Sequence, residues 1–187
     1  STVTVVGNAV FTGDIQKKTA GTSNFAAGVN AGNSIESDGN YNVVVGDEAG
    51  TAITTGDNNV AVGYAALDAN TTGDNNVAVG RNSLGANTTA GNNTAVGASA
   101  LDANTTGTGN NALGYNALSD NTTGNDNNAM GLYALGDNTT GDYNTAVGHY
   151  ALRVNTTADN NTAIGYAALD ANTTGIQNNA LGASALT

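Results

Sequence analysis

The chain has 187 residues, enough for one domain, and a formal net charge of −11 with only four Lys and Arg residues. So acidic a chain is not expected to bind nucleic acid or an anionic membrane, and no stretch of about 18 apolar residues predicts a helix inserted in a membrane. The absence of cysteine excludes disulfides and thiolate chemistry, and it suits an extracellular protein held together by backbone hydrogen bonds.

Residues 1–23 form a first segment that lacks the repeats found further along the chain. In residues 2–15 (TVTVVGNAVFTGDI), apolar and polar residues alternate around Gly7 and Asn8, which predicts two strands joined by a turn. Lys17 and Lys18 supply half of all basic residues. We expect this segment to act as a cap or a docking element.

Residues 24–187 consist of a repeated unit of 17 residues that is marked by a recurring glycine. Gly28 begins the series, Gly46 follows after one longer step of 18, and every later step is 17. Self-similarity at a short, fixed period predicts a stacked architecture in which each unit buries its apolar edge against its neighbours. The later glycines are Gly63, Gly80, Gly97, Gly114, Gly131, Gly148, Gly165 and Gly182.

Most positions of the unit accept a narrow range of residues when the recurring glycine is numbered as position 6. Position 4 is mostly Ala, position 5 is apolar, position 9 is mostly Ala, and position 10 is Leu from Leu67 to Leu186. Positions 13–15 read Asn-Thr-Thr seven times. Position 7, by contrast, accepts Tyr, Arg, Leu, His and Ala, which predicts an exposed site.

A unit of this length fits one turn of a parallel β-solenoid, an all-β fold. We predict two short strands per unit, at positions 3–6 and 8–11, joined by turns at the glycine and at the Thr-Thr-Gly-Asp-Asn stretch. Each turn rises by about 4.8 Å, so about ten turns give a rod of about 48 Å. A helix over residues 64–70 is the alternative, although so short a helix is marginal by itself.

Position 2 is asparagine in every unit, and position 13 is asparagine in seven units. We predict that these side chains stack into ladders along the rod, amide on amide, and satisfy the backbone of the turns. The Asn-Thr-Thr triplets also match the N-glycosylation acceptor, but glycans about 4.8 Å apart would collide, which favours a role in the turn. The regular position-2 column comprises Asn59, Asn76, Asn93, Asn110, Asn127, Asn144, Asn161 and Asn178.

Positions 4 and 5 are both apolar, although successive residues of a strand face opposite sides of a sheet. We expect the larger Val, Ile and Leu side chains to fill the coil and the alanines to pack closely against a sister chain. A thin monomeric coil that buries both sets is the alternative. The sequence ends at Thr187 in the middle of a unit, so we expect either end-to-end stacking on another subunit or continuation in a longer protein.

The phrase NNVAVGYAAL and its variants NTAVGASAL, NNALGYNAL and NTAIGYAAL resemble the head repeats of trimeric autotransporter adhesins of the YadA type. The matching triplets include residues 61–63 (Ala-Val-Gly) and 163–165 (Ala-Ile-Gly). The longer form with Asn-Thr-Thr-Gly is similar to repeats in fibre proteins of tailed phages, including cyanophages. The resemblance implies a left-handed parallel β-roll in which three chains lie side by side as a homotrimer.

The sequence offers little for catalysis, and we expect no enzymatic activity. His149 is the single histidine and occupies variable position 7, where a solvated side chain is expected. No nucleophile elbow, phosphate loop or HExxH motif occurs. No cofactor is predicted, although some aspartates could share a Ca²⁺ ion with turn carbonyls. These are Asp57, Asp74, Asp142 and Asp159 before the asparagine, and Asp68, Asp102 and Asp170 at position 11.

These features favour a non-enzymatic fibre or adhesin segment that is extracellular, on a cell surface or a virion. Repetition along the rod would present many weak contacts to a cell-surface glycan or a protein receptor and so give avidity. A filament subunit that stacks end to end is one alternative, and an ice-binding protein with a threonine column is another. The candidates for surface contact are Tyr64, Tyr115, Tyr133, Tyr150 and Tyr166.

Overall fold

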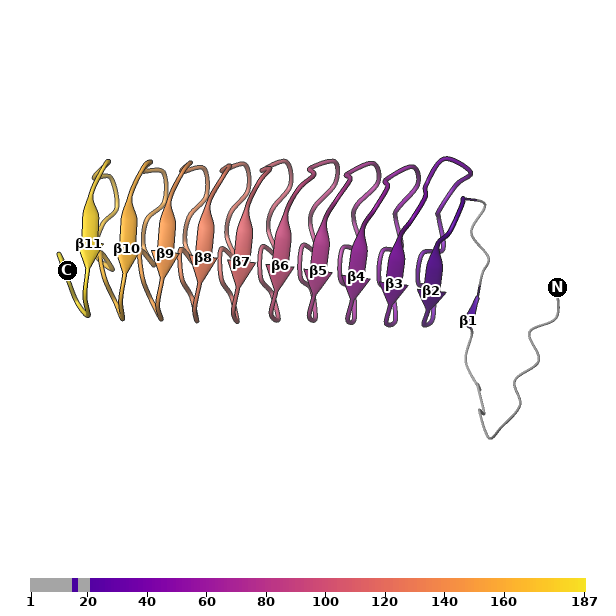
Figure 1. The fold of residues 1–187 in the computed structure, drawn as a ribbon, viewed down its shortest axis with the longest axis horizontal. Helices are drawn as coiled ribbons and strands as arrows, with labels where there is room; N and C mark the ends of the chain where they lie inside the picture. Colours follow the sequence, from indigo (N-terminus) through magenta and orange to yellow (C-terminus); the bar gives the residue numbers. More distant parts are fainter. Residues whose placement is uncertain (1–14, 17–20) are drawn as a thin grey trace, which may run out of the picture.

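The computed structural model describes residues 15–16 and 21–187, which form an elongated rod of stacked turns (Figure 1). All strands of this part belong to one eleven-stranded sheet, and their order in the sheet follows their order in the chain. The predicted all-β parallel solenoid is therefore confirmed. Within the described residues, no helix has the length and apolar character needed to cross a membrane.

The ten strands from β2 to β11 are mutually parallel, and β1 (Ile15–Gln16) lies antiparallel to β2 (Phe25–Ala27). The two strands predicted for residues 2–15 lie outside the described residues except for Ile15, as do Lys17 and Lys18. The other parallel strands are β3 (Val43–Val45), β4 (Val60–Val62), β5 (Val77–Val79), β6 (Thr94–Val96), β7 (Asn111–Leu113), β8 (Asn128–Met130), β9 (Thr145–Val147), β10 (Thr162–Ile164) and β11 (Asn179–Leu181).

Neighbouring strands from β3 onward pair in register with a shift of one unit, so that like residues stack on like. Ala61 of β4, for example, pairs with Ala78 of β5. The backbone N–H of Gly80 donates to the carbonyl of Val62 in the preceding turn at 2.8 Å. One sequence unit is therefore one turn of the coil, and each turn satisfies its strand backbone through the turns on either side.

Each turn contains one strand, and the prediction of a second strand at positions 8–11 is wrong. Positions 8 and 10 adopt left-handed backbone conformations, as at Ala65 (φ 50°) and Leu67 (φ 55°), which interrupt both an extended strand and a right-handed helix. The helical alternative for residues 64–70 is wrong for the same reason. The segment still bonds to the next turn, since the Leu67 N–H donates to the Ser83 carbonyl at 3.0 Å.

Small side chains from the strand and large ones from the opposite side fill the interior of the coil. Ala78 at position 4 and Leu84 at position 10 are completely buried, as are their equivalents in most turns. Burial of each leucine contributes about 1.5–3 kcal/mol to folding. Where position 10 is Gly50, position 4 is Val44, whose Cγ1 atom lies 2.7 Å from the site of a Cβ on Gly50. The two positions therefore share one volume.

The alanines of position 4 face the interior, so the prediction that they line an external seam is wrong. The coil is thin, and leucines from the opposite side leave room only for a methyl group on the strand. Position 5 points outward instead, and Leu113, Met130 and Ile164 are 46%, 51% and 40% exposed. The outward apolar column is thus formed by the larger side chains.

The recurring glycine is required for two independent reasons. Gly114 has a φ of 139°, which residues with a side chain rarely adopt. A Cβ on Gly114 would also lie 2.6 Å from the carbonyl oxygen of Gly131 in the next turn. Successive turns therefore approach too closely at the bend after the strand to admit a side chain.

Candidate binding surfaces

The asparagines of position 2 lie inside the coil and bind its backbone. Asn93 is completely buried, its Nδ2 donates to the Gly107 carbonyl at 2.9 Å, and its Oδ1 accepts from the Asn110 N–H at 2.9 Å. From Asn59 to Asn178, each backbone N–H of the column donates to the preceding amide oxygen. In this column the side-chain oxygen of one asparagine mainly bonds the backbone N–H of the next. The predicted stacking of side-chain amide on side-chain amide is therefore wrong for most of position 2.

The asparagines of position 13 form the amide-on-amide ladder. The Nδ2 group of Asn104 donates to Oδ1 of Asn87 and to the Gly107 carbonyl, both at 3.0 Å. Since Asn93 also donates to Gly107, this one carbonyl joins the two columns. Asn87 and Asn104 are completely buried, so the folded rod leaves no room for an N-linked glycan on them.

The two threonines of each triplet differ in exposure. The hydroxyl of Thr71 donates to the Thr88 carbonyl of the next turn at 3.1 Å, and its side chain is partly buried. Thr72 is exposed. One column of exposed threonines therefore runs along the rod.

The turn aspartates bind backbone groups. Oδ1 of Asp74 accepts from the Asp57 N–H at 2.7 Å. At position 11, Oδ1 of Asp68 and Oδ1 of Asp102 approach Gly85 from different turns, at 3.7 Å and 2.8 Å from where its Cβ would stand. No group of three or more His, Cys, Asp or Glu side chains placed to hold a metal ion occurs in residues 21–187.

Burial raises the pKa of three carboxyl groups at positions 11 and 12, namely those of Asp68, Asp102 and Asp137. Desolvation is the main cause in each case. The charge of Arg81 and a hydrogen bond from Ser99 lower the pKa of Asp102 and partly offset the rise caused by burial. These partly buried acids therefore ionise less readily than aspartates in water.

The side chains at positions 3 and 5 of β2 to β11 form the outer sheet face. Position 5 is apolar in every strand, and position 3 changes from Phe25 and valines to threonines and asparagines. Neither position carries a charged residue in any of these strands. A sheet with one face in water normally places polar residues there, and a long apolar column marks an interaction surface.

Four of the five candidate tyrosines form a strip over four successive turns, which we call the tyrosine strip. Its ring centroids lie 5.8 Å apart for Tyr115 and Tyr133, 6.0 Å for Tyr133 and Tyr150, and 6.2 Å for Tyr150 and Tyr166. Tyr115 and Tyr166 are exposed, whereas the two middle rings are half-buried. Tyr64 is 54% exposed and lies three turns before Tyr115, apart from the strip.

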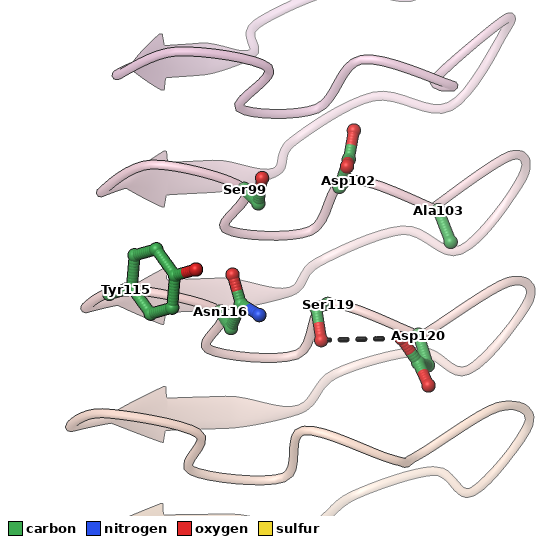
Figure 2. Close-up of a pocket in the computed structure, with 7 residues that line it drawn as sticks. All are labelled: Ser99, Asp102, Ala103, Tyr115, Asn116, Ser119 and Asp120. Atoms are coloured by element: carbon green, nitrogen blue, oxygen red, sulfur yellow. Dashed lines mark hydrogen bonds between the residues drawn. The ribbon is translucent and has the colours of Figure 1, made fainter.

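A shallow hollow of about 450 Å³ opens beside Tyr115 (Figure 2). Two successive turns line it, and its polar side chains are two aspartates, two serines, one asparagine and one tyrosine. The repeat pattern does not predict this hollow, because its lining comes from variable positions of different units. Position 8 does give an indication of the hollow, because it holds the small Ser99 here and the large Tyr133 and Tyr150 in later units. The lining residues are Ser99, Asp102, Ala103, Tyr115, Asn116, Ser119 and Asp120.

The surface of the rod therefore offers an apolar face, an aromatic strip and a polar hollow. His149 is exposed at position 7, as the variability of that position predicts. Comparison of the chain with protein-family models, with curated proteins and with solved structures finds no match in any of the three.

Proposed function

We propose that this chain is a non-enzymatic rod of an extracellular fibre or adhesin, on a cell surface or a virion, and that its repeated surfaces serve attachment. The observation that carries the proposal is the unbroken in-register stacking of ten parallel strands. Leucines, alanines and asparagine ladders fill the interior, so the available groups lie on surfaces that recur along the axis. The resemblance to adhesin heads and phage fibres supports the same role.

We further propose that sister chains cover the outer sheet face, three in the assembly that the resemblance implies. This face is uncharged although the whole chain carries −11, so its burial removes no charged side chain of the face from water. It also extends over all ten parallel strands. A second copy of the chain is the natural occupant, because its own apolar column has the same period and can match every turn.

The mass in solution tests this assembly. We expect sedimentation to give three chains for the unmodified protein and a single chain when Leu113→Glu and Met130→Glu are combined. Both residues are about half exposed, at 46% and 51%, so the solenoid should survive and its circular dichroism should be unchanged. The matched control is Leu132→Glu at position 7, beyond the glycine bend. An unmodified protein that sediments as one chain would contradict the assembly.

Attachment can be measured with fluorescently labelled rods on a panel of whole cells. We expect binding that weakens by orders of magnitude when the double variant separates the chains, because avidity depends on the number of linked surfaces. Electron microscopy of the same samples distinguishes the end-to-end filament, whose length would grow with protein concentration. Rods that adhere to no cell type would refute the attachment function.

A further inference from the structure

The tyrosine strip and the hollow are continuous, because Tyr115 belongs to both. Its ring is 50% exposed, contacts Tyr133 edge to face, and lines the hollow. Toward the other end of the strip, the Arg153 guanidinium lies 5.4 Å from the Tyr150 ring centroid and pairs with Asp170 at 3.2 Å. The rings thus form a surface several turns long, supported by contacts between neighbours, that leads into a polar recess.

The recess is rich in hydrogen-bond acceptors. Asp102 and Asp120 contribute carboxylates, and the Ser119 hydroxyl donates to Oδ1 of Asp120 at 3.3 Å. Asn116 and Ser99 add groups that both donate and accept (Figure 2). The complementary ligand carries many hydroxyl donors. The net charge of −11 and the two carboxylates disfavour a ligand with acidic groups.

The aromatic strip adds a second requirement, namely an apolar face that can lie on a ring. A pyranose has such a face formed by its C–H groups, together with hydroxyls around its edge. Neighbouring rings of the strip lie 5.8–6.2 Å apart along the rod at interplanar angles of 75°, 17° and 82°. An extended chain of sugars therefore meets ring faces and ring edges in turn. A single small polar molecule would use the recess and leave the strip unused.

We propose that the hollow and the tyrosine strip form one binding site for a neutral oligosaccharide that lies along the rod axis. One sugar occupies the hollow against Tyr115, with its hydroxyls donating to Asp102 and Asp120, and the following sugars lie over the strip. This inference rests on the proposed attachment function and names the class of receptor that the rod recognises.

Titration of the full chain with neutral glucose, galactose and N-acetylglucosamine oligomers of increasing length tests the site. Tyrosine fluorescence reports binding directly because the chain has no tryptophan. We expect at least one series to bind, with an affinity that rises with length, and Tyr115→Ala to weaken it about tenfold. Tyr64→Ala is the matched control, because Tyr64 also occupies position 7 and has a similar exposure of 54%.

Several outcomes would overturn the site. Binding by none of the three neutral series, equal losses for Tyr115→Ala and Tyr64→Ala, or binding only of sialylated or sulfated sugars would each do so. Binding only of a basic peptide such as oligolysine would show that the acidic recess takes cations instead. Rods that adhere to cells but bind no neutral oligomer would refute this site alone, whereas rods that adhere to nothing would refute the attachment function itself.

Discussion

At the scale of single residues, the coil depends on four positions per unit with positive φ. In one unit these are Asn92 (63°), Gly97 (138°), Ser99 (54°) and Leu101 (53°). Asparagine and glycine tolerate such conformations, but a left-handed backbone at a leucine costs about 1–2 kcal/mol of folding free energy. Complete burial of Leu101 offsets this cost, since removing its side chain from water contributes about 1.5–3 kcal/mol.

The close approach of turns at the recurring glycine predicts that a Gly→Ala substitution destabilises the middle of the rod more than its last turn. Gly114→Ala should lower the free energy of unfolding by more than about 3 kcal/mol, because it adds a clash with Gly131 to backbone strain. Gly182→Ala should cost only about 1–3 kcal/mol, because its φ is 125° but nothing lies within 4 Å of the new Cβ. Denaturant unfolding of both variants measures the difference, and equal losses would contradict the role of close approach.

The left-handed conformation of position 1 can be tested without disturbing the interior. Asn92 is exposed and has a φ of 63°. Asn92→Gly should change the free energy of unfolding by less than about 0.5 kcal/mol, whereas Asn92→Val should reduce it by about 1–2 kcal/mol. Thermal melting followed by circular dichroism is sufficient. A valine variant as stable as the glycine variant would argue against the left-handed backbone.

At the scale of one turn, the strand is only three residues long, and many of the other backbone N–H groups donate to carbonyls of neighbouring turns. Side-chain amides satisfy a few further backbone groups. Each position-2 asparagine typically joins three groups: the preceding amide oxygen, the next asparagine N–H, and a carbonyl 14 residues ahead. Loss of one such side chain therefore leaves the buried N–H of the next asparagine without a partner and removes one of the two hydrogen bonds to the carbonyl. The hydrogen-bonded turn, more than the strand itself, is the unit that stacks.

Adjacent asparagines in one strand region allow a direct test of this view. Asn110→Ala should destabilise the rod by about 2–4 kcal/mol, because it leaves the buried N–H of Asn127 unpaired and removes a bond to Gly124. Asn111→Ala, one residue later on the outer sheet face, removes no hydrogen bond inside the coil and should lower stability much less. Chemical denaturation of the two variants gives the comparison, and similar losses would show that burial of the amide is unimportant.

The period and the recurring residues were sufficient to predict the stacking, the parallel strands and the role of the asparagines in bonding the turn backbone. The direction of the apolar faces was not predictable, because Ala at position 4 and Val at position 5 are equally consistent with either side of a strand. Their placement depends on Leu84 and its equivalents, which enter the same volume from across the coil. The left-handed positions did leave a signal in Gly32 and Gly50 at position 10 and in Gly109 at position 1. The hollow at Tyr115 depends on side chains of two turns and has no signature within one unit.

At the scale of the whole molecule, charge and apolar surface are separated. The outer sheet face is uncharged along its length, whereas Asp68, Asp102 and Asp137 lie at positions 11 and 12, away from the strand. Burial raises the pKa of these three carboxyls, so the folded rod binds their protons more tightly than the unfolded chain does. Their contribution to stability is therefore fully present at low pH and is lost as the pH rises through their raised folded-state pKa values.

Removal of these carboxyls should change the pH dependence of stability. We expect Asp68→Asn combined with Asp102→Asn to raise the melting temperature at neutral pH and to flatten its fall as the pH rises above the ordinary aspartate pKa. Each group should account for less than about 1 kcal/mol, because solvent screens a partly exposed charge. Asp38→Asn combined with Asp126→Asn removes the same charge from exposed sites and serves as the control. An identical pH profile for the two double variants would contradict the effect of burial.

The hydrogen bonds of the position-2 column all have the same sense, since from Asn59 to Asn178 each N–H donates toward the earlier turn. The rod therefore has a direction: a ligand or partner that runs from the N-terminal to the C-terminal turns meets different chemistry from one that runs the opposite way. A sister rod or a long ligand that contacts several levels at once meets their groups in a fixed sequence. Parallel and antiparallel side-by-side arrangements are consequently different complexes with different contacts at every level.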